Sequence, residues 1–202
     1  MTKRLTIGIQ GGVGSFNEQA LGTYLERRGG APGEVEIRYL YTTDNVLSEL
    51  KSRTIDRGQF AVENSLGGPV QETRAAQTKH SFDQNYEVVD CYSIQVAHCM
   101  MIHPEARPEE IDTIMTHPQV LAQCSETIGR RYPGLALVEG EGDLVDPAKV
   151  GEAIAHSRLP RNVATVSNRL IADAQGLKIV DRNLQDRADN FTTFVYVKLR
   201  DK

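Results

Sequence analysis

Two adjacent threonines near the C-terminus, Thr192 and Thr193, carry hydroxyl groups that could donate a hydrogen bond to a bound substrate. They stand between the polar pair Asp189 and Asn190 and an alternating run of aromatic and branched residues at 194–197. Alternation of this kind predicts a β-strand. The threonines are therefore either the polar beginning of a strand or groups that face a ligand, and the local sequence leaves both interpretations open.

Polar side chains also follow two other strand-like runs. Glu63 and Asn64 come directly after a short apolar run, where a carboxylate either stabilises a turn or contacts a ligand. His117 ends a second run, and Gln119 and Gln123 follow it at positions that share one face of a helix. His117 could act as a general acid or base, because the ordinary pKa of histidine lies near neutral pH. It could equally cap the helix that follows.

A glycine turn near the N-terminus leads into a helix. Ser15 and Glu18 have the spacing of a capping box. Backbone N–H groups at such a helix start can bind an anion. Gly11, Gly12 and Gly14 do not match the spacing of a dinucleotide-binding motif, and no Walker motif follows. A tight turn with a capped helix is the alternative interpretation.

Strand-like and helix-like segments alternate along the chain. Strands are expected at 4–10, 35–41, 60–62, within the long β-rich stretch 86–104, and at 113–117, 135–140, 162–168 and 192–199. Helices are expected to start at Ser15, at Thr43 or Asp44, and at Pro118, Asp146 and Arg169, with Gly176 ending the last of these. This alternation predicts an α/β fold with a parallel or mixed sheet. Open α/β sheets bind ligands at the carboxyl ends of their strands, which is where the polar loops fall.

The composition excludes several classes of protein. The chain has 202 residues, 40% hydrophobic and 25% charged, with a net charge of -4. These values are typical of a globular protein and argue against binding to nucleic acid or to an anionic membrane. Cys91, Cys99 and Cys124 are widely spaced, which favours a reducing cytoplasm and predicts no metal site. Cys99 and Cys124 are expected to pack in the core, although Cys124 could also line a pocket. We expect no targeting segment and no membrane-spanning segment.

Four segments, taken in order, resemble the signature segments of the prephenate dehydratase family. They are GxxGSFxEQA at 11–20, VENSLGG at 62–68, HPQxLAQC at 117–124 and DNFTTF at 189–194. The resemblance spans nearly the whole chain. It implies a catalytic domain without the ACT regulatory domain, which would convert prephenate to phenylpyruvate without a cofactor. The expected protein is a cytoplasmic homodimer that binds neither nucleic acid nor membrane.

The resemblance also implies a two-lobed α/β fold like that of type II periplasmic binding proteins, with the active site in the cleft between the lobes. The implied domain covers residues 1–202. Its first lobe would consist of residues 1–91 and 178–202, and its second of residues 92–177.

The family reaction suggests roles for individual residues. Prephenate loses a hydroxyl group and a ring carboxylate as its ring becomes aromatic, so the departing hydroxide needs assistance and two carboxylates need fixed positions. Thr192 corresponds to the threonine of the family's last motif and is implied to hydrogen-bond the leaving oxygen. The implied catalytic residues are Thr192, Glu63, Asn64 and Gln119, and the implied substrate-binding residues are Gly14, Ser15, Phe16, Ser65, His117, Gln123, Thr193 and Phe194.

This chain departs from the family pattern at two informative positions. Thr193 stands where the family has an arginine, and Gly12 stands where proline is usual. Losing a charged hydrogen bond costs about 1.5–3 kcal/mol, which is roughly ten- to a hundredfold in affinity or rate. Arg74 and Arg169 are candidates to replace the missing charge.

Two other functions stay open on the sequence. One is a prephenate decarboxylase, which removes carbon dioxide without forming an aromatic ring; the missing arginine allows it and the retained Thr192 counts against it. The other is a non-catalytic module that binds a small carboxylate, against which the full set of polar residues counts.

Overall fold

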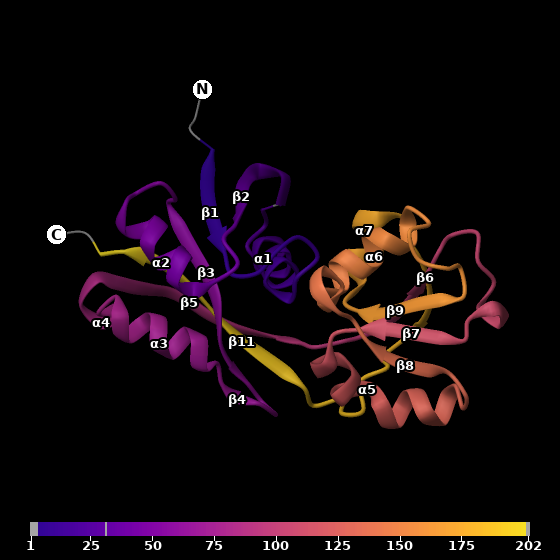
Figure 1. Cartoon of the computed structure of the whole chain (residues 1–202). Helices are drawn as coiled ribbons and strands as arrows, with labels where there is room; N and C mark the ends of the chain where they lie inside the picture. The colour runs from indigo at the N-terminus through magenta and orange to yellow at the C-terminus, as the bar shows by residue number, and fades with distance from the viewer. Residues whose placement is uncertain (1–3, 31, 201–202) are drawn as a thin grey trace. The chain divides into compact units, whose positions relative to one another are not determined.

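A computed structural model describes residues 4–30 and 32–200 of the chain, which form two compact units (Figure 1). The first unit extends to Gln95 and resumes at Asp189, and the second is Val96–Ala188. The chain rejoins the first unit later than position 178, because strand β10 (Lys178–Arg182) pairs with strand β6 (Cys99–Ile102) of the second unit. The position of a cleft between two lobes stays a prediction.

The first unit is built on a six-stranded mixed sheet with the order β2-β1-β3-β11-β5, in which β4 pairs with β3. Its strands are β1 (Leu5–Ile9), β2 (Val35–Tyr39), β3 (Arg57–Asn64), β4 (Gly68–Pro69), β5 (Tyr86–Gln95) and β11 (Phe191–Leu199). Strand β1 is parallel to β2 and β3, and β11 is antiparallel to β3 and β5. The carboxyl ends of β1, β2, β3 and β5 therefore meet the start of β11 at one edge, which we call the carboxyl edge.

Helical segments follow the strands of this sheet. They are α1 (Phe16–Arg27), η1 (Pro32–Glu34), α2 (Thr43–Lys51), α3 (Gln71–Lys79) and α4 (Phe82–Asn85). Ser15 caps α1 as predicted, since its side chain accepts from the backbone of Glu18. The cap of α2 is Thr42 rather than the expected Thr43 or Asp44, because Thr42 has an extended backbone and its hydroxyl accepts from Asn45 N at 3.2 Å.

The second unit holds a five-stranded sheet with the order β10-β6-β9-β7-β8. Its remaining elements are η2 (Pro108–Glu110), β7 (Thr113–Thr116), α5 (Pro118–Arg131), β8 (Ala136–Glu139), η3 (Gly142–Val145), α6 (Pro147–Ala155), β9 (Val163–Ser167) and α7 (Arg169–Gln175). Strand β9 is parallel to β7, antiparallel to β6 and buried along its whole length. The predicted α/β fold with a mixed sheet is confirmed.

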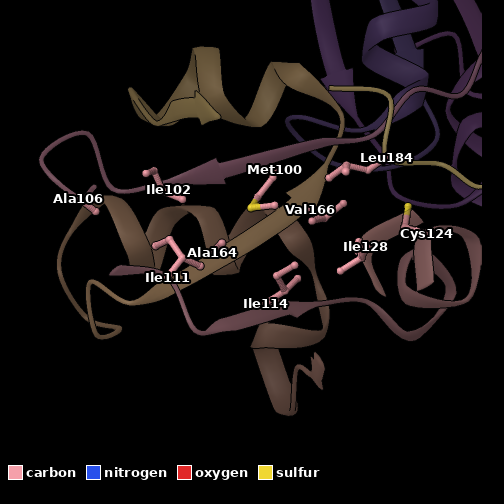
Figure 2. Packing of buried hydrophobic residues seen from close by; sticks show 10 residues of the cluster. All are labelled: Met100, Ile102, Ala106, Ile111, Ile114, Cys124, Ile128, Ala164, Val166 and Leu184. Atoms are coloured by element: carbon pink, nitrogen blue, oxygen red, sulfur yellow. The ribbon is translucent and has the colours of Figure 1, made fainter. Parts of the chain in front are cut away.

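One hydrophobic cluster of the second unit joins its sheet to α5 and to the chain after β10. Figure 2 shows Cys124 and Ile128 on α5 and Leu184 on the connecting segment. Leu184 and Cys124 are fully buried. Burial raises the pKa of the Cys124 thiol to about 12, so this side chain is a packing group, as the sequence predicted, and not a nucleophile at neutral pH.

The segment after β10 is also held to α5 by hydrogen bonds. The carboxylate of Asp186 accepts from Thr127 N at 2.7 Å and from Glu126 N at 3.2 Å, and Asp186 N donates to the carbonyl of Gln123 at 2.7 Å. A side chain that binds N–H groups inside a helix replaces part of the helical hydrogen-bond ladder. Asp186 therefore fixes the middle of α5 to the connecting segment.

A buried histidine lies beside this connection. His98 is 1% exposed, and its Nε2 donates to the side-chain oxygen of Gln123 at 3.0 Å. Its backbone N–H donates to Gln185 Oε1 at 3.0 Å. Burial lowers the pKa of His98, since a charged imidazole loses hydration there, and the hydrogen bond with Gln123 opposes that shift.

No helix within residues 4–30 and 32–200 is long and apolar enough to cross a membrane. In the same described residues, no group of three or more His, Cys, Asp or Glu side chains is arranged to hold a metal ion.

Phe194 and Phe191 lie on the same strand and give a matched pair for measuring what β11 contributes to stability. Phe194 is 1% exposed and packs with Ala61 and Ile94, whereas Phe191 is 43% exposed. Phe194→Ala should lower the free energy of unfolding by about 3–5 kcal/mol. Phe191→Ala should change it by less than about 0.5 kcal/mol. Urea denaturation of both variants measures this, and equal losses would contradict the packing described for Phe194.

His98 should make stability depend on pH. Its folded-state pKa is lowered, so below about pH 6.5 the unfolded chain binds a proton that the folded chain does not. The free energy of unfolding should therefore fall as the pH drops through this range, until the folded-state pKa is reached. His98→Gln should flatten this dependence in urea titrations from pH 7.5 to 5. His156→Gln, which removes an exposed histidine, is the control, and an equal effect of both variants would refute burial as the cause.

Candidate functional site

The carboxyl edge of the first unit brings Asn64 and Thr192 together, although they are far apart in the sequence. They are register partners on β3 and β11. The side-chain N–H₂ of Asn64 donates to Thr192 Oγ1 at 3.0 Å and to Asn190 Oδ1 at 2.7 Å. Its side-chain oxygen accepts from the backbone N–H groups of Leu66 and Gly67 at 3.0 and 2.8 Å. Asn64 thus uses both ends of its amide to hold a turn and the start of β11.

Ser65 completes this connection. Its hydroxyl donates to the carbonyl of Asp189 and accepts from Phe191 N, both at 2.9 Å, and its backbone N–H donates to the carbonyl of Phe191 at 2.8 Å. The predicted substrate-binding residue Ser65 is therefore occupied in fixing the segment that leads into β11. We call Asn64, Ser65, Asn190 and Thr192 the β3–β11 clasp.

The hydroxyl of Thr192 can act as a hydrogen-bond donor. Because Thr192 Oγ1 accepts the hydrogen bond from Asn64, its own proton remains to be donated in another direction. The side chain is partly exposed. A hydroxyl fixed in this way can donate a hydrogen bond to an oxygen atom of a bound molecule.

Thr193 and Glu63 point to the face of the sheet opposite to the one that carries Asn64 and Thr192. Thr193 is opposite Glu63 on β3 and Ser93 on β5, and its hydroxyl lies 2.9 Å from Ser93 Oγ. Residues directly opposite each other point to the same face, and successive residues point to opposite faces. The register therefore places Glu63 with Thr193 and away from the face that carries Asn64 and Thr192. The sequence did not identify Ser93, and its position in the expected strand was the only signal for it.

The glycine turn is already filled by the chain's own groups. Gly14 N donates to Glu18 Oε2 at 2.6 Å, and Ser15 N donates to the carbonyl of Gly12 at 3.2 Å. The other carboxylate oxygen of Glu18 accepts from the hydroxyl of Tyr39 at 2.6 Å. Burial raises the pKa of Tyr39, and the hydrogen bond to Glu18 adds to that shift. Two of the N–H groups expected to receive a substrate carboxylate therefore have partners within the chain.

Two other residues expected to bind substrate contribute to packing. Phe194 is buried, and Phe16 packs against the same cluster of Ala20, Ala61 and Ile94. Their side chains support the sheet beneath Thr192.

A polar network behind the glycine turn was not found from the sequence. Gln10 accepts from Ala61 N at 3.0 Å and donates to Glu72 Oε2 at 2.7 Å. Glu72 in turn accepts from the backbone and hydroxyl of Thr43, both at 2.9 Å. The network joins the end of β1 to the starts of α2 and α3. The only sequence signal was the position of Gln10 directly after the first strand.

The second unit contains the remaining predicted site residues. His117 is the N-cap of α5, where its Nδ1 accepts from Gln119 N at 3.0 Å, so the ring proton resides on Nε2. His117 also lines a pocket of about 530 Å³ with Asp143, Asp146 and Lys149. The side chain of Gln119 is exposed. Gln123 binds the buried His98 instead of facing outward.

The two arginines considered as replacements for the missing family arginine lie on helices α3 and α7. Arg74 lines a hollow with Ser81 and Phe82, which follow the C-terminal end of α3. Arg169 is the first residue of α7 in the second unit. Thr193 instead has the hydroxyl of Ser93 as its neighbour.

A family model and curated relatives of this chain point to the same family. The family model described as prephenate dehydratase matches residues 7–202. Arogenate dehydratase/prephenate dehydratase 2, chloroplastic, of Arabidopsis thaliana is 28% identical over 192 residues, covering 95% of this chain and 46% of the relative. The bifunctional chorismate mutase/prephenate dehydratase of Neisseria gonorrhoeae is 27% identical over 191 residues, covering 95% of this chain and 49% of the relative. The chain thus spans about half the length of these curated relatives.

A solved structure agrees at the level of the fold. The prephenate dehydratase from Arthrobacter aurescens, determined in complex with L-Phe, superposes with a TM-score of 0.78 at 21% identity, covering 98% of this chain and 61% of that one. The match of the family model over nearly the whole sequence, together with this fold, confirms the resemblance noted in the four motifs. The chain belongs to the prephenate dehydratase family.

Proposed function

We propose that the chain is a prephenate dehydratase that converts prephenate to phenylpyruvate in phenylalanine biosynthesis. The observation that carries this proposal is the β3–β11 clasp, in which Asn64 donates to Thr192 Oγ1 and leaves the threonine proton free to be donated. Family membership supports the reaction class. The clasp supports Thr192 as the group that acts on the leaving oxygen.

The proposed reaction breaks two bonds of the substrate. The bond between the ring and its carboxylate breaks, carbon dioxide leaves, and the electron pair enters the ring. The ring carbon–oxygen bond breaks with its electron pair on oxygen, and one proton from solvent converts the departing hydroxide to water. Thr192 stabilises the negative charge that develops on this oxygen by hydrogen bonding, since an alcohol is too weak an acid to protonate it beforehand. No cofactor takes part.

We assign the substrate's carboxylates to residues whose side chains can donate a hydrogen bond. His117 accepts at Nδ1, so its Nε2–H is a donor, and the exposed amide of Gln119 is a second donor. We assign Asn64 and Ser65 to positioning Thr192, and Gln123 to positioning α5 through His98. Glu63 lies opposite Thr193, and we propose that its negative charge lies beside the site.

Arogenate is a second candidate substrate, because the names of several relatives include arogenate dehydratase. It carries an amino group where prephenate has the keto group of its side chain, and the ring chemistry is the same. The assay below therefore uses both compounds.

We also propose that the protein is a homodimer in the cytoplasm that binds neither nucleic acid nor membrane. Three free cysteines, of which Cys91 is exposed, support a reducing compartment. The dimer rests on the family resemblance.

Thr192→Val, which replaces the hydroxyl by a methyl group of similar size, should lower kcat for prephenate by about a hundred- to a thousandfold. Thr192→Ser keeps the hydroxyl and should retain most of the activity. Phenylpyruvate formed from prephenate is measured by its alkaline absorbance, phenylalanine formed from arogenate is measured in a separate sample, and consumption of each substrate is followed in parallel. Because prephenate aromatises slowly by itself, a protein-free sample is required.

Three results of this assay would contradict the dehydratase proposal. Consumption of prephenate without phenylpyruvate would identify a decarboxylase. No consumption of either substrate would indicate a binding module. Full activity of Thr192→Val would remove the role assigned to the hydroxyl.

Thr193→Arg restores the residue that the family carries and should raise kcat/KM for prephenate by about ten- to a hundredfold. Thr193→Lys should give a smaller gain, because an ammonium cannot bind a carboxylate with two parallel hydrogen bonds. Thr193→Gln is the uncharged control. No gain from either charged variant would contradict this prediction and show that the chain does not use a cation at the position.

A further inference from the structure

Tyr41 has an unusual backbone conformation between β2 and α2. Its φ is +65°, and the flanking backbone closes a hydrogen bond from Thr42 N to the carbonyl of Leu40 at 2.7 Å. A bond from residue i+2 to residue i around a positive φ is a γ-turn of the rare, strained type. Among the described residues, Tyr41 is the one aromatic residue with a positive φ.

The surrounding groups hold this turn in place. The carbonyl of Leu40 also accepts from the side chain of Asn45 at 2.8 Å, and Leu40 N donates to the carbonyl of Ile9 at 2.9 Å. Glycine would form the same turn without strain. Strained residues that their surroundings fix in this way cluster at functional sites, and the cost of placing a tyrosine here therefore indicates a use for its side chain.

The side chain of Tyr41 is directed outward at the carboxyl edge. It is 69% exposed, more than any other large hydrophobic residue of the described chain. Parallel pairing of β1 with β2 puts the Tyr41 turn beside the glycine turn, since Ile9 and Tyr39 are register partners. The clasp lies on the same edge, with Asn64 two strand spacings and Thr192 three strand spacings from β2, at about 4.8 Å for each spacing.

Gly12 lies against the ring of Tyr41 and leaves room for it. A Cβ atom at Gly12 would lie 3.2 Å from Cε1 and 3.9 Å from Cδ1 of Tyr41. Gly12 does not have a positive φ, so a larger residue here would act by pressing on the Tyr41 ring and not by straining the backbone. The departure from the family's usual proline at this position thus coincides with a tyrosine ring lying against the turn.

We propose that Tyr41 is a substrate-binding residue, whose phenol donates a hydrogen bond to a carboxylate of the substrate while its ring packs against the substrate's apolar ring. This rests on the proposed function, since the ligand is a cyclic dicarboxylate. The N–H groups of Gly14 and Ser15 are bound to Glu18 and to Gly12, so the glycine turn needs another donor. A phenol supplies a donor and an apolar surface together.

The test compares four variants for KM, kcat and melting temperature. Tyr41→Phe should raise KM for prephenate about tenfold with an unchanged melting temperature, because only the donor is lost. Tyr41→Gly should raise KM at least as much, while its melting temperature rises by about 2–4 °C as the strain is relieved. Gly12→Ala should raise KM in the same direction by displacing the ring.

Arg53→Gly is the matched control. Arg53 also has a positive φ, +59°, but lies beyond the C-terminal end of α2, whereas Tyr41 precedes its start. This variant should gain stability and leave KM unchanged. A KM within twofold of the wild-type value in both Tyr41 variants, with wild-type turnover intact, would overturn the proposal.

Calorimetric titration with phenylpyruvate separates this proposal from the proposed function. If the wild-type chain binds phenylpyruvate but turns over neither substrate, weaker binding by Tyr41→Phe and Tyr41→Gly still supports the contact, and equal binding by all variants refutes it. If the wild-type chain neither binds nor reacts, both the contact and the proposed function are wrong.

Discussion

The return of the last strand to the first sheet is the constraint on which the candidate site depends. Strand β11 inserts between β3 and β5, and its first residues are held by Asn64 and Ser65. Burial of Phe194 directly after the two threonines fixes the register of this strand. A shift by one residue would bury a threonine and expose the phenylalanine, so core packing and the orientation of Thr192 are determined together.

The group that accepts a hydrogen bond at the glycine turn is a side chain of the same helix and not the bound anion that the sequence suggests. A helix start with glycines before it attracts an anion, and in this chain Glu18 supplies that anion from within the helix. Its second carboxylate oxygen binds Tyr39, so a single side chain connects α1 to the end of β2. The loop is thereby stabilised by the chain's own groups.

Departures from the family pattern are distributed over the same edge of the sheet. Thr193 shares a hydrogen bond with Ser93 where an arginine would stand, and Gly12 leaves room for the exposed ring of Tyr41. Thr193 puts a neutral hydroxyl group where the family has a charged one, and Gly12 puts the smallest residue where proline is usual. They provide a physical reason to test the strength and selectivity of substrate binding in this chain, while the clasp holds the Thr192 hydroxyl in place.

Sequence alone determined the local features of this protein. The alternation of strands and helices, the caps at Ser15, Asp146 and Gly176, the burial of Cys124 and the family motifs could all be recognised, because each depends on residues close together in the chain. Tertiary structure decided the rest. The pairing of Asn64 with Thr192, the separation of Glu63 from them, the binding of Gln123 to His98 and the strained turn at Tyr41 arise from strand register and burial, which join distant segments and are not encoded in any short motif.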